Sequence, residues 1–464
     1  MGSNRKLGST NRVHMIGIGG SGMLGIASIL LKKGFFVSGS DVSITKDLLL
    51  LQKEGALIQE GHKPDLIKRA QIVVFSSAIK QSNPELKEAK ARNLIIVPRA
   101  QMLSSIITGY RNIAVAGSHG KTTTTSLLAE IFIKAKKDPT YVVGGKILSG
   151  GKSSNLGKGD TMIFEADESD GSFSHFHPDV ALVTNVDNDH LAFYKNDLNN
   201  LHKAFKHFLR NIPFYGHAVI NGDDANLKKI LSFVKRRFIT VGFNKKNDFI
   251  ISNLAVKNKF QTFQIRSSTD QRFMTLRTPL FGKHNVLNSS LAAITALEEG
   301  INKASIKAAI KEFKGTSRRF EEQIVRINNK NTIMVDDYGH HPAEINATIE
   351  AVYQKFGSKN ICMFFEPHRF SRTKQLFSDF VKVLAKISEV HIFPIYPASE
   401  KPVRGITSKK LVSEINKING NAYLIDKRSV KEVLYERNSV PDVILVQGAG
   451  SIAEIASLIK EYER

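Results

Sequence analysis

The sequence predicts an α/β protein made of three domains, each built on a mostly parallel sheet. The length of 464 residues allows about three domains at roughly 150 residues each. Short apolar runs alternate with longer helical patterns along the chain, which is typical of βαβ units. The alternation restarts twice, and we place the boundaries near residues 108 and 320. The predicted domains are residues 1–108, 109–320 and 321–464.

Each domain has its own series of predicted strands and helices. In the first domain we predict strands at residues 13–18, 35–38 and 72–75, and helices at 23–31 and 46–51. In the second we predict strands at 112–116, 162–164 and 180–183, and a helix at 122–134. In the third we predict strands at 332–335, 361–365, 390–393 and 443–446. Residues 243–274 are polar and alternating, which predicts an antiparallel edge or a surface insertion.

The composition is that of an ordinary soluble globular protein, with 42% hydrophobic and 23% charged residues. No apolar run approaches the roughly 18 residues that would span a bilayer. The first ten residues are polar and lack the apolar stretch of a signal peptide. The single cysteine, Cys362, cannot form an internal disulfide, which favours a reducing compartment. We therefore expect a cytoplasmic protein without stable membrane association.

The net charge of +23 is the unusual number in the composition. Such an excess suggests a nucleic-acid partner. The three predicted domains carry +8, +13 and +2, so the charge is spread over two thirds of the chain and forms no basic tail. The chain is also rich in Lys, Asn and Ile, and codon bias alone could produce the excess.

A glycine-rich motif, GIGGSG, lies between the first predicted strand and the first predicted helix. Glycines let backbone amides approach a pyrophosphate, and a helix N-terminus attracts an anion. An acid at the end of the second strand stands where a dinucleotide-binding domain binds ribose. The candidate binding residues are Gly17, Gly19, Gly20, Ser21, Gly22 and Asp41. A tight turn without a ligand is the simpler alternative, and an NAD-dependent oxidoreductase also stays open.

A second loop, GSHGKTTTT, follows the strand at 112–116 and opens a helix, which is the context of a P-loop. In such a loop the amides hold phosphates, the lysine contacts the terminal ones and a threonine hydroxyl can bind Mg²⁺. The usual pattern has a further glycine where this chain has Val115, so the loop is not a standard Walker A. The candidate residues are Gly117, Ser118, His119, Gly120, Lys121, Thr122 and Thr123.

Acidic residues follow the next two predicted strands of the second domain, in EADESD (residues 165–170) and in NVDNDH (residues 185–190). Carboxylates crowded at one sheet edge repel one another unless a cation lies between them, and Mg²⁺ prefers such oxygen ligands. A solvated acidic loop is the alternative. The four acids of EADESD and His190 are the candidate metal residues, because all belong to the same edge as the P-loop.

Three further motifs have side chains suited to ligand binding. GKHNVLN opens a helix and places Asn285 and Asn288 on one face, where they could contact a base or a phosphate. In the third domain, DDYGHHP and EPHRFSRT each follow a predicted strand, and ligands bind open α/β sheets at this edge. Arg369 and Arg372 could clamp a carboxylate or phosphate. Ordinary surface charge is the alternative for either motif alone.

Taken together, these motifs closely resemble those of the Mur ligase family, and the resemblance covers nearly the whole chain. In order, the matching motifs are GIGGSG, GSHGKTTTT, EADESD, TNVDNDH, GKHNVLN, SRRFE, DDYGHHP and EPHRFSRT. Several motifs in a fixed order are far more specific than any one of them. The resemblance implies a Rossmann-like N-terminal domain, a central P-loop ATPase-like domain and a Rossmann-like C-terminal domain.

The family resemblance implies an ATP-dependent ligase that joins L-alanine to UDP-N-acetylmuramate in peptidoglycan precursor synthesis. ATP would phosphorylate the muramate carboxylate, and the amine would attack the acyl phosphate and expel phosphate. A related ligase that adds a preformed tripeptide to the same acceptor stays open. Glycine and L-serine also stay open as the amino acid, because one small group changes binding to a pocket by only about 1–3 kcal/mol.

The resemblance also implies roles for single residues. Those implied in catalysis are Lys121, Glu165, His190 and Arg319. One Mg²⁺ would be held by Thr122 or Thr123, and a second by Glu165 and His190. ATP would contact the P-loop, Asn285, Asn288 and Asp337. The UDP-sugar would lie on the glycine loop and Asp41, and the candidates for the acceptor and amino-acid ends are His340, His368, Arg369 and Arg372.

The same resemblance distributes the ligands over the three domains. The first would hold the UDP-sugar, the second ATP, and the third would close over ATP and the amino acid. We therefore expect a monomer or weak homodimer that uses ATP and Mg²⁺ and binds no nucleic acid. The positive charge would then serve two small polyanions instead of a polymer.

Overall fold

The computed structural model describes residues 8–257, 259–357, 360–398, 400–436 and 439–462. Most of the N-terminal segment that we expected to lack a signal peptide therefore lies outside the described residues. The chain divides into two compact units, each described below by itself. The first comprises Met1–Pro279 with Asn285–Lys314, and the second comprises Leu280–His284 with Gly315–Arg464. Within the described residues, no helix is both long and apolar enough to cross a membrane.

The first unit begins with a five-stranded sheet in which all neighbouring strands are parallel. Its order is β3 (Leu57–Glu60), β2 (Phe36–Asp41), β1 (Arg12–Ile16), β4 (Ile72–Phe75) and β5 (Ile95–Pro98). The helices that connect these strands are α1 (Ser21–Lys32), α2 (Lys46–Lys53), η1 (Leu66–Arg69), α3 (Pro84–Ala91) and α4 (Arg99–Ile107). The strand predicted at residues 13–18 ends two residues early, because Gly17 turns the chain with a φ of 75°.

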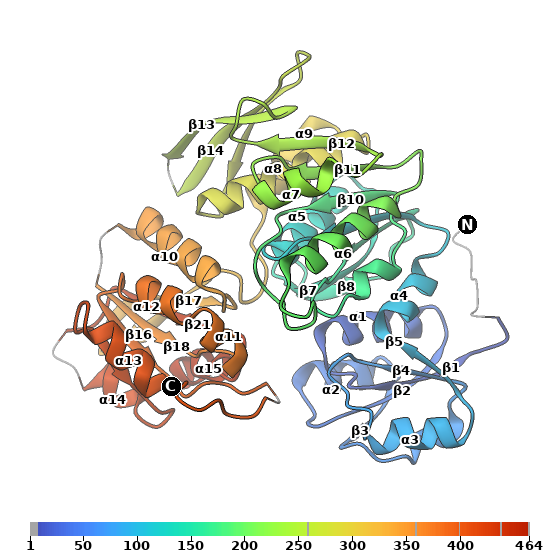
Figure 1. The fold of residues 1–464 in the computed structure, drawn as a ribbon, viewed down its shortest axis with the longest axis horizontal. Helices are drawn as coiled ribbons and strands as arrows, with labels where there is room; N and C mark the ends of the chain where they lie inside the picture. Colours follow the sequence, from blue (N-terminus) through green and yellow to red (C-terminus); the bar gives the residue numbers. More distant parts are fainter. Residues whose placement is uncertain (1–7, 258, 358–359, 399, 437–438, 463–464) are drawn as a thin grey trace. The chain divides into compact units, whose positions relative to one another are not determined.

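A ten-stranded sheet forms the rest of the first unit (Figure 1). Its order is β15 (Phe273–Thr278), β14 (Phe260–Ser267), β13 (Phe249–Lys257), β12 (Arg237–Gly242), β11 (His217–Asn221), β10 (Val180–Val183), β6 (Arg111–Ala116), β9 (Thr161–Glu165), β7 (Thr140–Ile147) and β8 (Lys152–Asn155). Neighbours are parallel from β13 to β7, while β13–β14, β14–β15 and β7–β8 are antiparallel. The antiparallel edge predicted from the alternation of residues 243–274 is thus confirmed.

The helices of the ten-stranded part include those that connect its parallel strands, because parallel neighbours need a crossover connection. They are α5 (Lys121–Lys134), η2 (Ser172–His175), α6 (Leu198–Arg210), α7 (Ala225–Leu231), α8 (Lys283–Glu298) and α9 (Lys303–Glu312). Helix α1 of the first sheet packs on β7 and β8 of the second. Gly25 permits this approach, because a Cβ there would lie 2.9 Å from the side chain of Val142. One continuous hydrophobic core therefore spans both sheets.

The second unit contains a six-stranded sheet with a single antiparallel pair, β16–β17. Its order is β16 (Glu321–Ile327), β17 (Lys330–Asp337), β21 (Val443–Gln447), β18 (Ile361–Phe365), β19 (Glu389–Ile392) and β20 (Ala422–Leu424). Its helices are α10 (Pro342–Phe356), α11 (Phe370–Gln375), α12 (Phe377–Leu384), α13 (Ser408–Asn416), α14 (Val430–Tyr435) and α15 (Ala453–Glu461).

Helices cover both faces of this third sheet. Side chains of β18 alternate between two cores, as expected of a central strand. Met363 and Phe365 pack with α10, α12 and α13, while Cys362 and Phe364 pack with α14 and α15. The three mostly parallel α/β sheets that the sequence predicts are therefore present, and the carboxyl ends of their strands hold the motifs described next.

Candidate functional site

The glycine loop and Asp41 lie together at the carboxyl edge of the first sheet. The amide of Gly19 donates to Oδ2 of Asp41 at 2.8 Å, and a Cβ on Gly19 would lie 2.9 Å from the same oxygen. Helix α1 begins at Ser21 without a side-chain cap at Gly20. The first amides of an uncapped helix can bind an anion. The structure therefore brings the glycine loop, the uncapped start of α1 and the carboxylate of Asp41 together.

Arg99 is a residue that the sequence reasoning missed. It begins α4, and a Cβ on Gly22 would lie 2.7 Å from its Nη1 atom, so its guanidinium reaches the first turn of α1. Its Nη2 atom lies 3.9 Å from carboxylate oxygens of both Asp167 and Asp170. Arg99 therefore connects the glycine loop to the acidic motif EADESD. The sequence around Arg99 does not indicate that it lies beside the glycine loop, because the loop is far from it along the chain.

The P-loop joins β6 to α5 and depends on glycine at two positions. Gly117 and Gly120 have φ values of 132° and 81°, which side chains with a Cβ rarely adopt. Gly120 also faces Asn288, whose amide group would lie 2.9 Å from a Cβ at that position. The structure thus brings one of the two predicted asparagines onto the loop. Asn285 lies one turn away on α8, and its Oδ1 accepts from Nδ2 of Asn288 at 3.5 Å.

Lys121 lies at the start of α5 with its side chain 14% exposed, and it is held by three acceptors. Its Nζ donates to the carbonyl of Gly117 at 2.6 Å, to that of Ser118 at 3.3 Å and to Oε2 of Glu168 at 2.8 Å. Burial alone would lower the pKa of Lys121, but Glu168 and Asp167 outweigh it and raise that pKa above its ordinary value. The lysine is therefore a fixed positive charge inside the loop.

Glu168, the fourth residue of EADESD, is the second residue that the sequence reasoning missed. It is fully buried, and its Oε1 has no hydrogen-bond partner among the described residues. Burial raises its pKa to about 7, although Lys121 acts in the opposite direction. The hydroxyl of Tyr194 donates to its backbone carbonyl at 2.5 Å. The sequence has four acids in this motif, and only the fold shows that Glu168 is the one that accepts from Lys121.

Glu165 and Thr122 form a pair of oxygen donors beside Lys121. Glu165 is the last residue of β9 and pairs with Val115, so it belongs to the strand and not to the following loop as predicted. Its Oε1 accepts from the amide of Gly144 at 2.6 Å, and its Oε2 accepts from the hydroxyl of Thr122 at 3.2 Å. A carboxylate next to a hydroxyl is a donor set that suits Mg²⁺.

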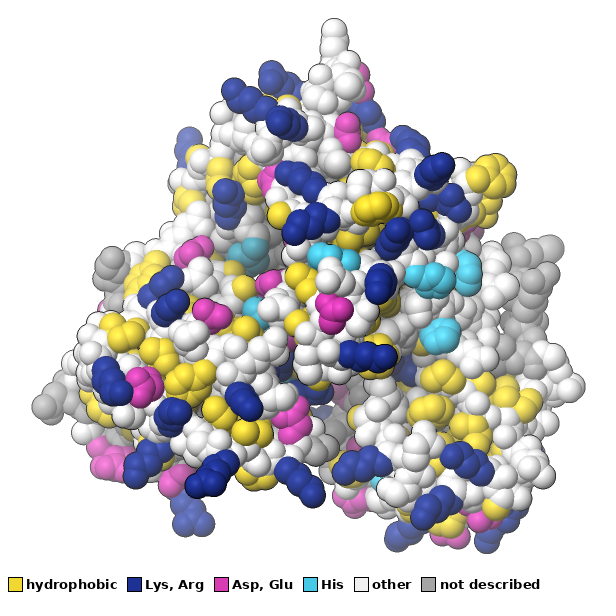
Figure 2. Space-filling view, in the orientation of Figure 1, with side chains coloured by type: hydrophobic (Ala, Val, Ile, Leu, Met, Phe, Trp, Pro, Cys, Tyr) yellow, Lys and Arg dark blue, Asp and Glu magenta, His cyan; other side chains and the backbone are white. Residues whose placement is uncertain are grey.

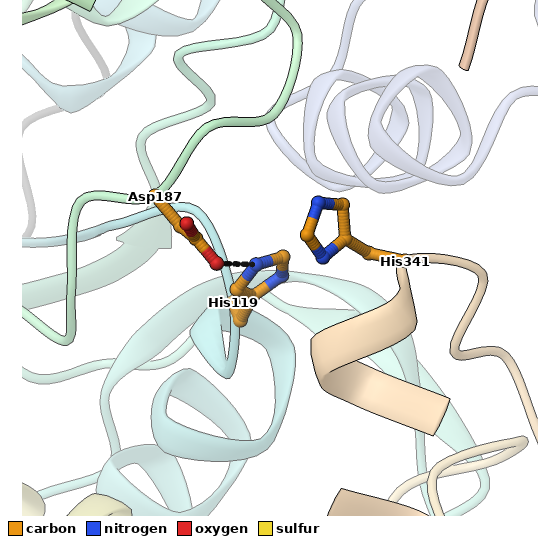
Figure 3. A group of neighbouring side chains, drawn as sticks. All are labelled: His119, Asp187 and His341. Carbon is orange, nitrogen blue, oxygen red and sulfur yellow. Dashed lines mark hydrogen bonds and ion pairs between the residues drawn. The ribbon is translucent and has the colours of Figure 1, made fainter. Parts of the chain in front are cut away.

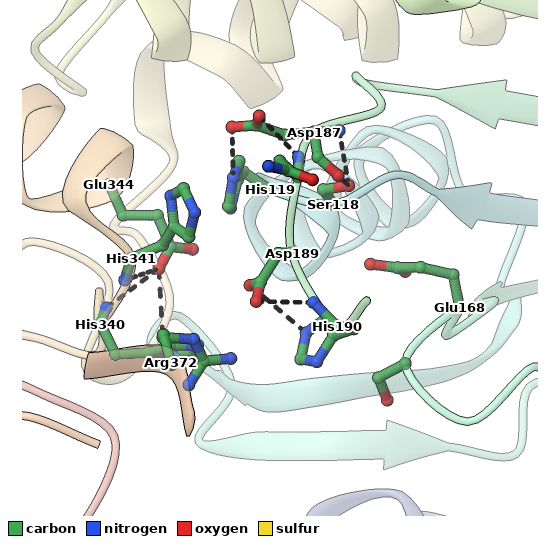
Figure 4. A network of polar contacts seen from close by, with 12 residues as sticks. Ser118, His119, Glu168, Asp187, Asp189, His190, His340, His341, Glu344 and Arg372 are labelled. Atoms are coloured by element: carbon green, nitrogen blue, oxygen red, sulfur yellow. Dashed lines mark hydrogen bonds and ion pairs between the residues drawn. The ribbon is translucent and has the colours of Figure 1, made fainter. Parts of the chain in front are cut away.

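His190 lies on the loop after β10 and takes a left-handed conformation, with φ 56°. Its amide donates to Oδ1 of Asp189 at 2.8 Å, and its Nε2 lies 3.5 Å from Oδ2 of that residue (Figure 4). Burial would raise the pKa of Asp167, but Lys121 above all, and also His190, hold that pKa below its ordinary value, so the His190 ring lies near the acidic motif. A strained backbone of this kind clusters at functional sites.

Two other residues of the 185–190 loop, Asn185 and Asp187, contact the P-loop. The side chain of Asn185 accepts from the amide of His119 and donates to its carbonyl, both at 2.9 Å. The Nε2 atom of His119 lies 3.1 Å from Oδ2 of Asp187 (Figure 3), and the amide of Asp187 donates to the hydroxyl of Ser118 at 2.9 Å. The two loops therefore form one network at the sheet edge.

In the second unit, Asp337 is buried at the end of β17. Both DDYGHHP acids lie inside the strand and not after it, because β17 pairs with β16 and β21 up to Asp337. Its Oδ1 accepts from the amide of Gly339 at 2.8 Å, and its Oδ2 accepts from the amide of Phe320 at 2.9 Å. Burial raises its pKa although Arg319 opposes this. Arg319 itself lies over the ring of Tyr338, 4.8 Å from the centroid.

The histidines and arginines of the third domain gather after β17 and β18. His368 lies between two rings: it stacks on Tyr396 with centroids 5.4 Å apart, and His340 lies 5.6 Å away on a tilt. Nη1 of Arg372 lies 3.2 Å from Nδ1 of His368. Arg369 has a φ of 71°, and its buried Nε has no hydrogen-bond partner among the described residues. His340, His368 and Arg372 thus form one cluster, to which the structure adds Tyr396, and the amide of Arg369 donates to the carbonyl of Tyr396 at 2.8 Å.

On the face drawn in Figure 2, lysine and arginine side chains are scattered among acidic, histidine and hydrophobic side chains. On this face the basic side chains are therefore dispersed.

The chain was compared with known protein families and proteins. Residues 12–111 match the Mur ligase family, catalytic domain; residues 115–297 match the Mur ligase middle domain; and residues 318–450 match the Mur ligase, glutamate ligase domain. A UDP-N-acetylmuramate–L-alanine ligase of Aquifex aeolicus is 43% identical over 443 residues, which cover 96% of each chain. One of Psychrobacter arcticus is 41% identical and covers 96% of this chain and 93% of its own.

Among solved structures, a UDP-N-acetylmuramate–alanine ligase of Thermotoga maritima superposes with a TM-score of 0.83 and 26% identity, covering 97% of this chain and 98% of its own. A murein peptide ligase of Psychrobacter arcticus, at 22% identity and a TM-score of 0.74 with the same two coverages, has the same fold. A MurF ligase of Thermotoga maritima, solved in complex with ADP, has 17% identity and a TM-score of 0.61 over 92% of this chain and 94% of its own.

Proposed function

The chain belongs to the Mur ligase family, and we propose that it joins L-alanine to UDP-N-acetylmuramate at the expense of ATP, in the synthesis of peptidoglycan precursors. The observation that carries this proposal is the 43% identity to a UDP-N-acetylmuramate–L-alanine ligase over 96% of both chains. The geometry of the P-loop supports it, because Lys121 is a fixed charge in a loop shaped for phosphates. Because the reaction consumes ATP and a UDP-sugar, we propose that the protein acts in the cytoplasm.

The proposed reaction has two steps. An oxygen of the muramate carboxylate attacks the γ-phosphorus of ATP, and the bond to the β-phosphate oxygen breaks to release ADP. The amine of L-alanine then attacks the carbonyl carbon of the acyl phosphate, gives up a proton and expels inorganic phosphate. Such reactions depend on positioning and charge stabilisation more than on covalent chemistry by the protein.

We assign the phosphates of ATP to the P-loop of the second domain. The amides of residues 117–123 would surround them, and Lys121 would exchange its contact with Glu168 for the β- and γ-phosphate oxygens. Glu168 fits the role of a positioning residue, because it holds the ammonium group in the loop at 2.8 Å. Asn288 fits a place beside the loop because it packs on Gly120. Asn285 lies one helical turn from it and would act on the same ligand.

The residues near Lys121 fit Mg²⁺. The hydroxyl of Thr122 and the carboxylate of Glu165 lie 3.2 Å apart, and Oε1 of the buried Glu168 has no partner among the described residues. Mg²⁺ takes oxygen ligands of this kind and would neutralise the charge that develops on the phosphates. His190 would add a nitrogen near the same edge. Thr122, Glu165 and His190 are therefore our proposed ligands.

We assign the UDP-sugar to the glycine loop and Asp41, which makes a nicotinamide cofactor unnecessary there. Arg99 supports this assignment, because its guanidinium reaches the first turn of α1 and would meet the diphosphate. The cluster of His340, His368, Arg369 and Arg372 is our proposal for the carboxylate ends of the acceptor and the amino acid. Arg319 and Asp337, which both belong to the second compact unit, would act on ATP, although both Asp337 oxygens already accept backbone amides.

The proposed function is tested by phosphate release together with mass spectrometry of the product. ATP, Mg²⁺ and UDP-N-acetylmuramate are supplied with L-alanine, glycine, L-serine or the preformed tripeptide. We expect turnover with L-alanine and a product heavier than the acceptor by one alanine residue. Turnover with the tripeptide alone would contradict the proposal and assign the recycling reaction. The oligomeric state stays a prediction, and sedimentation velocity would distinguish a monomer from a weak homodimer.

A further inference from the structure

Three potential metal ligands meet in the third sheet, outside the residues assigned to ligation. Cys362 lies in β18, and Glu389 and His391 lie in the neighbouring strand β19. The strand register places Cys362 beside Glu389, and His391 lies two residues further on the same face. Sγ, a carboxylate oxygen and a ring nitrogen all lie within 4.8 Å of one another. We propose that this cluster binds Zn²⁺.

The donor set selects the kind of metal. Thiolate and imidazole favour Zn²⁺ and similar ions of intermediate softness, whereas Mg²⁺ takes oxygen ligands. Bonds of about 2.0–2.3 Å in a tetrahedral site separate two ligand atoms by about 3.3–3.8 Å. Sγ of Cys362 lies 3.8 Å from Oε1 of Glu389, which already fits. Nε2 of His391 lies 2.7 Å from the same oxygen, so these two groups need to separate by only about 1 Å.

The three side chains are held on rigid elements, which reduces the cost of forming the site. The ring of His391 is fixed between Phe364 and Tyr423, which stack on it with centroids 5.4 and 5.3 Å away. Cys362 is fully buried, while the side chain of Glu389 is 21% exposed. The ion therefore enters from the side of Glu389, and water completes the coordination as the fourth ligand.

The cluster lies away from the residues assigned to ligation. Cys362 is the second residue of β18. Glu366, the first residue of the motif EPHRFSRT at the carboxyl edge of the sheet, follows the end of that strand. Four residues of a parallel strand span about 13 Å, so the ion is separate from the carboxyl edge. When Zn²⁺ binds, the S–H bond of Cys362 breaks, its proton passes to solvent and the sulfur binds the ion. The ion then links β18 to β19 and stabilises the second unit.

The test uses the full chain without a histidine tag, in excess Mg²⁺ so that oxygen sites are filled. Co²⁺ is added first, because a thiolate-to-cobalt charge-transfer band reports sulfur coordination, and Cys362 is the only cysteine. Zn²⁺ affinity is then measured by competition with a chromogenic chelator. The variants are Cys362→Ser and His391→Gln, with His207→Gln, an exposed histidine of α6, as the matched control.

We expect the charge-transfer band in the native chain and in His207→Gln, and its absence in Cys362→Ser. Both site variants should bind Zn²⁺ at least tenfold more weakly than the control. Zn²⁺ should raise the unfolding temperature of the native chain and leave that of His391→Gln nearly unchanged. If Cys362→Ser does not fold, His391→Gln alone decides, because it retains the thiol. No sulfur band in the native chain, or equal Zn²⁺ affinity in all variants, would overturn the proposal.

Discussion

Replacing Glu168 by glutamine removes a buried carboxylate from beside Lys121 while keeping the size of the side chain. Glu168 is fully buried, and burial raises its pKa from 4.5 to about 7. Between these two pH values the folded chain binds more protons than the unfolded chain, so folding stability falls as the pH rises. Glutamine does not titrate, so the variant does not lose folding stability in this way as the pH rises. The variant should therefore be more stable than the native chain at high pH.

The magnitude follows from the size of the pKa shift. One pKa unit corresponds to about 1.4 kcal/mol, so the full shift amounts to about 3 kcal/mol at pH 8 and to less than about 1 kcal/mol at pH 5. The first unit has about 300 residues. An unfolding entropy of about 2.1 cal/mol/K per residue then converts 3 kcal/mol into a shift of about 5 °C in the unfolding temperature.

The assay is thermal unfolding followed by circular dichroism at pH 5 and pH 8, without nucleotide. Asp170→Asn is the matched control, because it removes one negative charge from the same motif at a partly exposed position. We expect the unfolding temperature of Glu168→Gln to exceed that of the native chain by about 5 °C at pH 8 and by about 1 °C at pH 5. If the difference in unfolding temperature between Glu168→Gln and the native chain is equal at pH 5 and pH 8, the reasoning is refuted. A buried carboxylate that titrates between these pH values requires the difference to grow.

Three further substitutions test the assignment of the two nucleotide sites. Lys121→Ala should abolish ligation and leave the affinity for the UDP-sugar nearly unchanged in calorimetry; equal loss of both would mean that the sites are wrongly separated. Glu165→Ala should lower kcat and raise the Mg²⁺ concentration needed for half-maximal activity, and an unchanged Mg²⁺ dependence would move the metal elsewhere. Gly19→Ala should weaken UDP-sugar binding at least tenfold, because its Cβ would lie 2.9 Å from the carboxylate of Asp41, whereas the nearest atom to a Cβ on Gly20 is 3.7 Å away. Equal affinities of Gly19→Ala and Gly20→Ala would contradict that reading of the loop.

Much of the fold could be predicted because parallel strands are short, apolar and separated by helical patterns. The same regularity predicts where the candidate site lies, since the carboxyl ends of parallel strands collect the polar residues that follow them. The boundaries were less exact where pairing extends a strand into a motif. Glu165 and Asp337 are strand residues for this reason.

The residues that sequence reasoning missed act through the tertiary structure. Arg99 reaches the glycine loop from a helix about 80 residues along the chain, and no local pattern distinguishes it from a surface arginine. Glu168 lies in a motif of four acids, and only burial selects it as the partner of Lys121. The cluster around Cys362 depends on the register of β18 and β19, which the apolar pattern of each strand does not specify.

In the proposed reaction the chain activates the muramate carboxylate by phosphorylation and then transfers the acyl group to L-alanine. An isotope experiment follows both steps with UDP-N-acetylmuramate whose carboxylate carries two ¹⁸O atoms, supplied with ATP, Mg²⁺ and L-alanine. Mass spectrometry of the products should find one ¹⁸O in the inorganic phosphate and the other in the new amide. Label in AMP, or phosphate released without ¹⁸O while the amide forms, would contradict the account.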